Sequence, residues 1–173
     1  MTYQADLGLS MTPADHPAIK AHPLAEGGLV CVVPDGHPVS RLALVRPADL
    51  RGYPLIFCDR GRPRDVAIDE GPDDSAIAFD AAINVPCGQT ACMLVEQGAG
   101  IALVDEFSVK FKALRGLISR PFASEARVQI SLLHNRARPL SELASGFHQT
   151  MKRLAGSRAT ELSSLRVFHN AVL

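Results

Sequence analysis

The chain has 173 residues, of which 47% are hydrophobic, and its 18 basic and 18 acidic side chains give a formal net charge of zero. This length and apolar content indicate a globular protein with one sizeable core or two small lobes, and they exclude a disordered chain. The balanced charge, with no basic block and no Trp, gives no electrostatic argument for direct nucleic-acid binding. No apolar run is long enough to cross a membrane and no secretory signal is apparent, so we expect a cytoplasmic protein without a membrane partner.

The first third of the chain alternates apolar runs with turn residues, as is typical of an α/β sheet. A first strand over residues 5–9 ends at Ser10 and Met11, and the β-branched run over residues 28–33 predicts a buried strand. The Pro and Gly residues of 34–38 then predict a turn.

A short helix with Pro in its first turn is predicted over residues 46–50, and a strand follows over residues 55–57. Polar residues 58–63 form a loop at the carboxyl end of that strand, and residues 65–69 suit the beginning of a helix. Ligands of open α/β sheets gather at the carboxyl ends of strands, so this loop is a candidate part of a site.

Residues 84–105 read as a short strand, a polar turn, a two-turn helix, a glycine stop and a second buried strand. Gln89 and Thr90 fall where the helix begins, and we expect Thr90 or its neighbour to cap the free N–H groups there. Gly98 and Gly100 end the helix and turn the chain into the next strand. A helix start attracts anions, so this segment predicts one wall of a small-molecule pocket. A crossover helix without a ligand explains the same pattern equally well.

The last third of the chain predicts a helix, two strands and a longer amphipathic helix. The first helix covers residues 108–114 and the strands cover residues 117–122 and 128–133. Apolar residues recur at helical spacing over residues 140–154. From residue 156 onward the pattern weakens, and we expect a short extra helix or a loose tail.

Four cysteines lie on apolar or turn segments: Cys31, Cys58, Cys87 and Cys92. The spacing of the last two is not one that zinc sites use, and there is no Cys-x-x-Cys pair. We therefore expect neither a metal nor a cofactor, and we interpret the cysteines as packing residues.

The ordered series of motifs from about residue 6 to about residue 154 resembles the effector-binding domain of LysR-type transcriptional regulators. The series comprises Asp6-Leu-Gly-Leu9, Leu29-Val-Cys-Val-Val-Pro-Asp-Gly-His-Pro38, Pro47-Ala-Asp-Leu-Arg-Gly-Tyr-Pro-Leu-Ile56, Leu94-Val-Glu-Gln-Gly-Ala-Gly-Ile-Ala-Leu-Val-Asp105 and Arg138-Pro-Leu-Ser-Glu-Leu143. The run from Thr90 to Val95 and the Val-Asp ending are similar to the branch that senses opines and basic amino acids.

The resemblance implies an α/β fold like that of type 2 periplasmic binding proteins, in which two lobes enclose a ligand cleft. On that pattern residues 1–33 and 114–156 form an incomplete first lobe, residues 34–113 form the second lobe, and residues 157–173 form a C-terminal tail. No DNA-binding domain is expected, and the chain matches an N-terminally truncated member of the family. The incomplete first lobe would expose strand edges and apolar faces, so we expect a homo-oligomer or pairing with an intact regulator subunit.

The resemblance also implies effector contacts at the positions that match the family: Gln89, Thr90, Cys58, Asp59, Arg60, Ser10, Met11 and Asp105. Two of these have plain structural explanations as well. Asp59 can pair with Arg62 across their own loop, and Asp105 can cap the helix that follows it.

The first functional hypothesis is sensory, because in this family a small metabolite, here expected to carry a carboxylate or to resemble an amino acid, biases closure of the lobes. A non-sensing partner of an intact regulator is a second hypothesis. A solute-binding protein of the same fold is a third, and the missing signal peptide and lobe segment count against it.

An enzyme is the remaining alternative, because Ser10, His37 and Cys87 are of the residue types that supply a nucleophile and a general base. No nucleophile elbow, metal motif or phosphate loop supports such a site, and His37 lies in a turn between Gly36 and Pro38. We therefore expect no catalysis.

Overall fold

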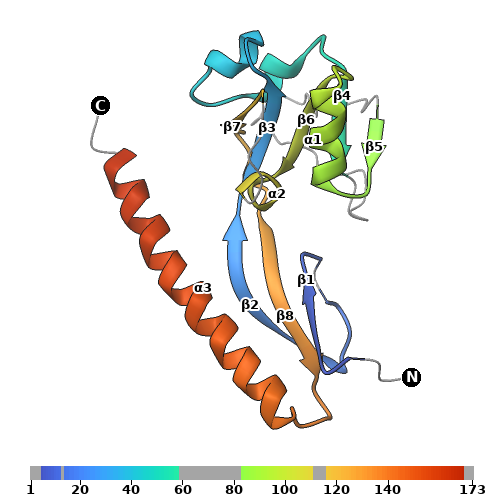
Figure 1. The fold of residues 1–173 in the computed structure, drawn as a ribbon, viewed down its shortest axis with the longest axis vertical. Helices are drawn as coiled ribbons and strands as arrows, with labels where there is room; N and C mark the ends of the chain where they lie inside the picture. Colours follow the sequence, from blue (N-terminus) through green and yellow to red (C-terminus); the bar gives the residue numbers. More distant parts are fainter. Residues whose placement is uncertain (1–4, 13, 59–82, 111–115, 170–173) are drawn as a thin grey trace, which may run out of the picture. The chain divides into compact units, whose positions relative to one another are not determined.

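The computed structural model describes residues 5–12, 14–58, 83–110 and 116–169, with side chains described up to residue 155. The chain divides into two compact units, which are described separately. Unit 1 comprises Met1–Glu26 and Gln129–Leu173, and unit 2 comprises Gly27–Val128. Strands and helices occur in both units, which confirms the predicted α/β class (Figure 1).

Unit 2 is built on a five-stranded mixed sheet with the strand order β5-β4-β6-β3-β7. Its strands are β3 (Leu29–Pro34), β4 (Leu55–Cys58), β5 (Ile83–Val85), β6 (Ile101–Asp105) and β7 (Leu117–Pro121). The strands β5, β4 and β6 run parallel, whereas β3 lies antiparallel to both β6 and β7. The helices of this unit are α1 (Gly88–Glu96) and α2 (Glu106–Lys110), with short 3-10 turns at Pro38–Arg41 and Pro47–Leu50.

The central strands of this sheet are buried on both faces, which explains their unbroken apolar sequences. Successive residues alternate between two cores: Ile101 and Leu103 face one, and Ala102 and Val104 face the other. Helix α1 covers the second core with Ala91, Cys92 and Val95, while the two 3-10 turns contribute Val39 and Leu50 to the first. The core therefore fixes the position of α1 on the sheet (Figure 1).

The glycines predicted to end α1 do so. Gly98 has φ 77° and its N–H donates to Val95 O at 3.0 Å, while Gly100 has φ 147°. A Cβ on Gly100 would collide with the backbone carbonyl of Pro54, whose oxygen accepts the N–H of Ile101 at 3.0 Å. Gly100 is therefore the residue that lets β6 begin beside β4.

Unit 1 contains a three-stranded sheet and one long helix. The strands are β1 (Leu7–Ser10), β2 (Ile19–Gly27) and β8 (Val128–Asn135), with β8 in the middle, and the helix is α3 (Glu142–His169). Strand β1 pairs with β8 antiparallel, from Leu7 opposite His134 to Ser10 opposite Ser131. Leu132 of the central strand is completely buried, as expected for the core of so small a sheet.

In unit 1 the sequence interpretation missed one strand and ended one helix too early. Strand β2 was missed because Pro23 interrupts its apolar pattern, but β2 is an edge strand, where a residue without an N–H is tolerated. Helix α3 continues to His169 instead of ending near Leu154, since residues 157–169 contain neither Gly nor Pro and include several good helix formers.

The division by contacts falls after Glu26 and after Val128, whereas the sequence interpretation placed the lobe boundaries at residues 33 and 113. Strands β3 and β7 belong to unit 2 in this division, because they pair with each other and β3 pairs with β6. The assignment of the units to the two lobes of the family stays a prediction. The helix predicted to begin within residues 65–69 lies outside the described residues.

Candidate functional site

The candidate site of unit 2 lies at the carboxyl edge of its three parallel strands. Cys58 ends β4 and pairs with Val85, the last residue of β5, while Asp105 ends β6. The chain leaves β5 and enters α1 at Gly88, so the first turn of α1 begins at the same edge. The parallel pairing thus brings Cys58, Asp105 and the start of α1 to one end of the sheet, where α/β proteins bind ligands.

The first turn of α1 is not capped as predicted. The N-cap residue is Cys87, which makes no side-chain cap hydrogen bond, and the Thr90 hydroxyl lies 3.1 Å from Cys87 Sγ. Thr90 is the third helical residue, too far along to cap the helix, so that prediction was wrong. Gln89 is exposed and Thr90 is half-buried. The turn therefore offers backbone N–H groups, an amide and a hydroxyl for an incoming ligand.

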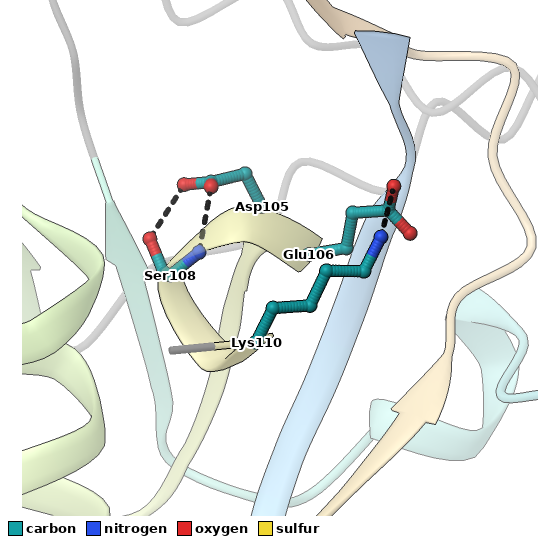
Figure 2. A network of polar contacts seen from close by, with 4 residues as sticks. All are labelled: Asp105, Glu106, Ser108 and Lys110. Atoms are coloured by element: carbon teal, nitrogen blue, oxygen red, sulfur yellow. Dashed lines mark hydrogen bonds and ion pairs between the residues drawn. The ribbon is translucent and has the colours of Figure 1, made fainter. Parts of the chain in front are cut away.

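The carboxylate of Asp105 holds the beginning of α2. Its Oδ1 accepts the backbone N–H of Ser108 at 2.9 Å, and its Oδ2 accepts the Ser108 hydroxyl at 2.7 Å (Figure 2). Asp105 is only 4% exposed. The capping explanation for Asp105 is confirmed, and a contact with an effector stays a prediction.

Ser108 also connects α2 to the candidate site. A Cβ on Gly88 would collide with Ser108 Oγ and come within 2.6 Å of Ser108 Cβ and 3.3 Å of Val104 Cβ. Gly88 is buried at the first position of α1. The start of α1 therefore packs directly on the side chain that Asp105 holds, and the position of the first turn depends on that hydrogen bond.

A second polar contact joins two side chains within α2. Lys110 Nζ lies 3.1 Å from Glu106 Oε1 (Figure 2). The same nitrogen lies 5.6 Å from the centroid of the Phe107 ring. Such a partly exposed pair one helical turn apart contributes little to stability. The Glu106 side chain also fills the space beside Gly27, where no Cβ fits.

The other predicted contacts lie in unit 1 or outside the described residues. Ser10 and Met11 belong to unit 1, where the Ser10 hydroxyl donates to Thr12 O at 2.8 Å and accepts the Thr12 N–H at 3.0 Å. This is a local turn after β1. Asp59 and Arg60 lie outside the described residues, as does the alternative pairing of Asp59 with Arg62.

The residues considered for catalysis have structural roles. His37 Nδ1 accepts the N–H of Val39 at 3.2 Å and thereby caps a 3-10 turn, and its ring meets Tyr53 edge-on at 4.6 Å. None of the four cysteines, all of which lie in the described ranges, forms a disulfide, and burial raises the pKa of the Cys31 thiol to about 12. Within the described ranges no three His, Cys, Asp or Glu side chains are placed to hold a metal ion. In the same ranges no helix is both long and apolar enough to cross a membrane.

Comparison with known proteins decides the family. The sequence model of the LysR substrate binding domain matches residues 2–156. The chain belongs to this family. It is 25% identical to the regulatory protein NocR of Agrobacterium tumefaciens over 146 residues, which cover 84% of this chain and 49% of the relative. It is 26% identical to the transcriptional activator protein LysR of Escherichia coli over 142 residues, which cover 82% of this chain and 46% of the relative. The chain thus spans about half the length of these LysR-family relatives.

Solved structures show the same fold. The regulatory domain of CcmR from Synechocystis PCC6803 matches with a TM-score of 0.70 and 13% identity, over 88% of this chain and 74% of that chain. The effector binding domain of QuiR matches with a TM-score of 0.68 and 21% identity, over 88% of this chain and 72% of that chain. These likenesses to LysR effector-binding domains confirm the predicted type 2 periplasmic-binding-protein-like fold.

Sequence reasoning missed two residues of the candidate site. Ser108 lies three positions after Asp105, the spacing at which an N-cap carboxylate accepts a backbone N–H, so this signal was present in the sequence. Gly88 carried no such signal, because its close approach to Ser108 depends on how α1 packs against α2.

Proposed function

We propose that the chain is the effector-sensing part of a LysR-type transcriptional regulator and that it binds a small metabolite bearing a carboxylate. Unit 2 supplies the first turn of α1 to this site, with Gln89, Thr90 and the backbone N–H groups beside them. The observation that carries the proposal is that this turn, with Gln89 exposed and Thr90 half-buried, lies at the carboxyl edge of three parallel strands. Such a turn stabilises a carboxylate through its N–H groups and the helix dipole.

The finer assignment to opine-like or basic amino-acid-like effectors rests on the resemblance of the helix run from Thr90 to Val95. A ligand of that kind carries a cationic group as well as a carboxylate. Asp105 is the acidic residue of the same edge, although Ser108 already donates to both of its carboxylate oxygens. Cys58, Asp59 and Arg60 complete the proposed contacts of this unit, and Ser10 and Met11 are the proposed contribution of unit 1. Two related fold neighbours have been solved with 2-PG and with shikimate, which supports an anionic ligand.

Thermal unfolding of the chain in the presence of single amino acids, opines and aromatic acids tests this proposal. A ligand at a hundredfold excess over its Kd raises the free energy of unfolding by about 2.7 kcal/mol. We expect a selective rise with one class of carboxylate. The rise should disappear in Gln89→Ala and in Thr90→Val, which keeps the shape of Thr90 but removes its hydroxyl. The matched control is Glu96→Gln, an exposed change at the far end of the same helix, which should keep the full rise. A rise that all three variants retain would place the ligand elsewhere.

We further propose that the chain self-associates or pairs with an intact regulator through unit 1. Large apolar side chains of α3 are exposed there at helical spacing, with Leu143 at 88%, Phe147 at 50% and Leu154 at 54%. A patch of this kind commonly marks a protein interface. Sedimentation velocity should give a mass above that of the 18.5 kDa monomer, and Phe147→Ser should lower it. A monomer at all concentrations would contradict self-association.

A further inference from the structure

Three histidines from three elements of unit 1 lie together where α3 meets the sheet. They are His22 on β2, His134 on β8 and His148 on α3. The Nε2 atoms of His22 and His134 are 3.1 Å apart, and the two rings are nearly parallel with centroids 5.2 Å apart. The His148 ring meets the His22 ring edge-on at 4.5 Å and lies 6.2 Å from the His134 ring. The cluster therefore links the helix to two strands.

The hydrogen bond between His22 and His134 depends on one nitrogen being unprotonated. His134 Nδ1 lies 3.0 Å from the carbonyl oxygen of Asn135, which can only accept, so Nδ1 carries the hydrogen and donates it. In the neutral ring this leaves His134 Nε2 as the acceptor for the N–H of His22 Nε2. The two facing Nε2 atoms therefore share a single hydrogen, and a second hydrogen between them would set two N–H groups against each other.

His148 is still less suited to carry a charge. Its Nε2 is buried and has no hydrogen-bond partner among the residues that the structure describes. A charged ring with a buried, unpartnered nitrogen is costly, because neither water nor protein replaces its lost hydration. Burial in the folded state therefore favours the neutral form of His148.

The charged neighbours act in the same direction. Burial is the largest cause that lowers the pKa of His22 below 6.5, followed by His148, Lys152, His134 and Lys20. Burial, then Lys152, His134 and Lys20, lowers the pKa of His148. These groups face the cluster from β2, from β8 and from α3, and each is cationic when protonated. Every proton taken up by the cluster thus meets repulsion from both sides of the helix–sheet contact.

We propose that His22 and His148 form, together with His134, a pH-responsive contact in unit 1, which holds α3 on the sheet while His22 and His148 are neutral and loosens it when they take up protons. A histidine whose pKa is lowered by folding binds more protons in the opened state than in the closed one. Its contribution to the closed state is complete above pH 6.5 and is lost as the pH falls from 6.5 through the lowered value. The contact requires no effector, so it is independent of the function proposed above.

Hydrogen exchange of the α3 amides of residues 145–155, measured from about pH 8 to about pH 5 with EDTA present and corrected for intrinsic rates, tests this contact. We expect the protection factors to fall by up to tenfold per pH unit for each histidine that gains a proton on opening. His148→Gln cannot be protonated and should reduce this slope. The matched control is His16→Gln, an exposed histidine of the same unit whose Nδ1 only accepts the Ala18 N–H, and it should keep the full slope.

Protection that stays constant below pH 6.5 would overturn the proposal, as would an equal effect of the two variants. If His148→Gln fails to fold, NMR titration of the unmodified chain gives the answer. The ring-proton shifts of His22 and His148 should give pKa values below 6.5, and pKa values at or above 6.5 would overturn the proposal.

Discussion

Gly88 at the start of α1 gives the sharpest test of how the candidate site is held in place. In Gly88→Ala the new Cβ collides with the side chain of Ser108, including its Cβ, which cannot rotate away. We expect Ser108 to move and its 2.7 Å hydrogen bond to Asp105 Oδ2 to break. A hydrogen bond to a charged group contributes about 1.5–3 kcal/mol, and water cannot replace it at a carboxylate that is 4% exposed. The gain from replacing Gly in a helix is at most about 1 kcal/mol. The net loss in free energy of unfolding is therefore about 0.5–3 kcal/mol.

Urea unfolding followed by circular dichroism measures this loss as a lower midpoint at an unchanged slope. The control is the same change in a Ser108→Gly background, where neither the hydroxyl nor the Cβ remains to be displaced. There Gly88→Ala should cost less, since the collision with Ser108 and the hydrogen bond are both gone and only the 3.3 Å contact with Val104 Cβ remains. Equal costs in the two backgrounds would refute the reasoning, and so would a Gly88→Ala variant as stable as the parent.

Two further predictions concern the ends of β6. Gly100→Ala should lower the free energy of unfolding by about 2–4 kcal/mol, because it adds a collision with the Pro54 carbonyl to the strain of φ 147°. Gly98→Ala should lower it by only about 1–2 kcal/mol, because Gly98 has φ 77° and open space around it. Equal shifts of the urea midpoint for the two variants would count against the close approach. Asp105→Ala should cost about 1–2 kcal/mol through loss of the cap, and Asp105→Ser should recover about half of this in the same assay, because a serine side chain also accepts the Ser108 N–H. A serine variant as unstable as the alanine variant would show that the cap is not what Asp105 contributes.

The local features of the fold could be predicted from sequence. The order strand, helix, glycine stop and strand over residues 84–105 is confirmed, because apolar period, turn chemistry and glycine position all agree there. The capping role of Asp105 could be predicted for the same reason. Both features depend on residues within a few positions of one another.

The features that sequence reasoning missed depend on distant partners or on position within a sheet. Strand β2 tolerates Pro23 only because it lies at an edge, which the sequence pattern does not reveal. The hydrogen bond between His22 and His134 joins residues 112 positions apart. The N-cap position at Cys87 was missed because Thr90 is the better capping residue by type, yet the helix begins before it. Register and packing decided each of these cases.

The central claim is that the first turn of α1 binds an anionic effector, and amide NMR shifts test it most directly. The carboxylate that raises the unfolding temperature most should be titrated into labelled protein. We expect the amides of Gly88, Gln89 and Thr90 to shift saturably with one common Kd, while amides at the far end of the helix near Glu96 stay in place. Shifts confined to other segments, or no saturable shift at these three amides with any carboxylate tested, would contradict it.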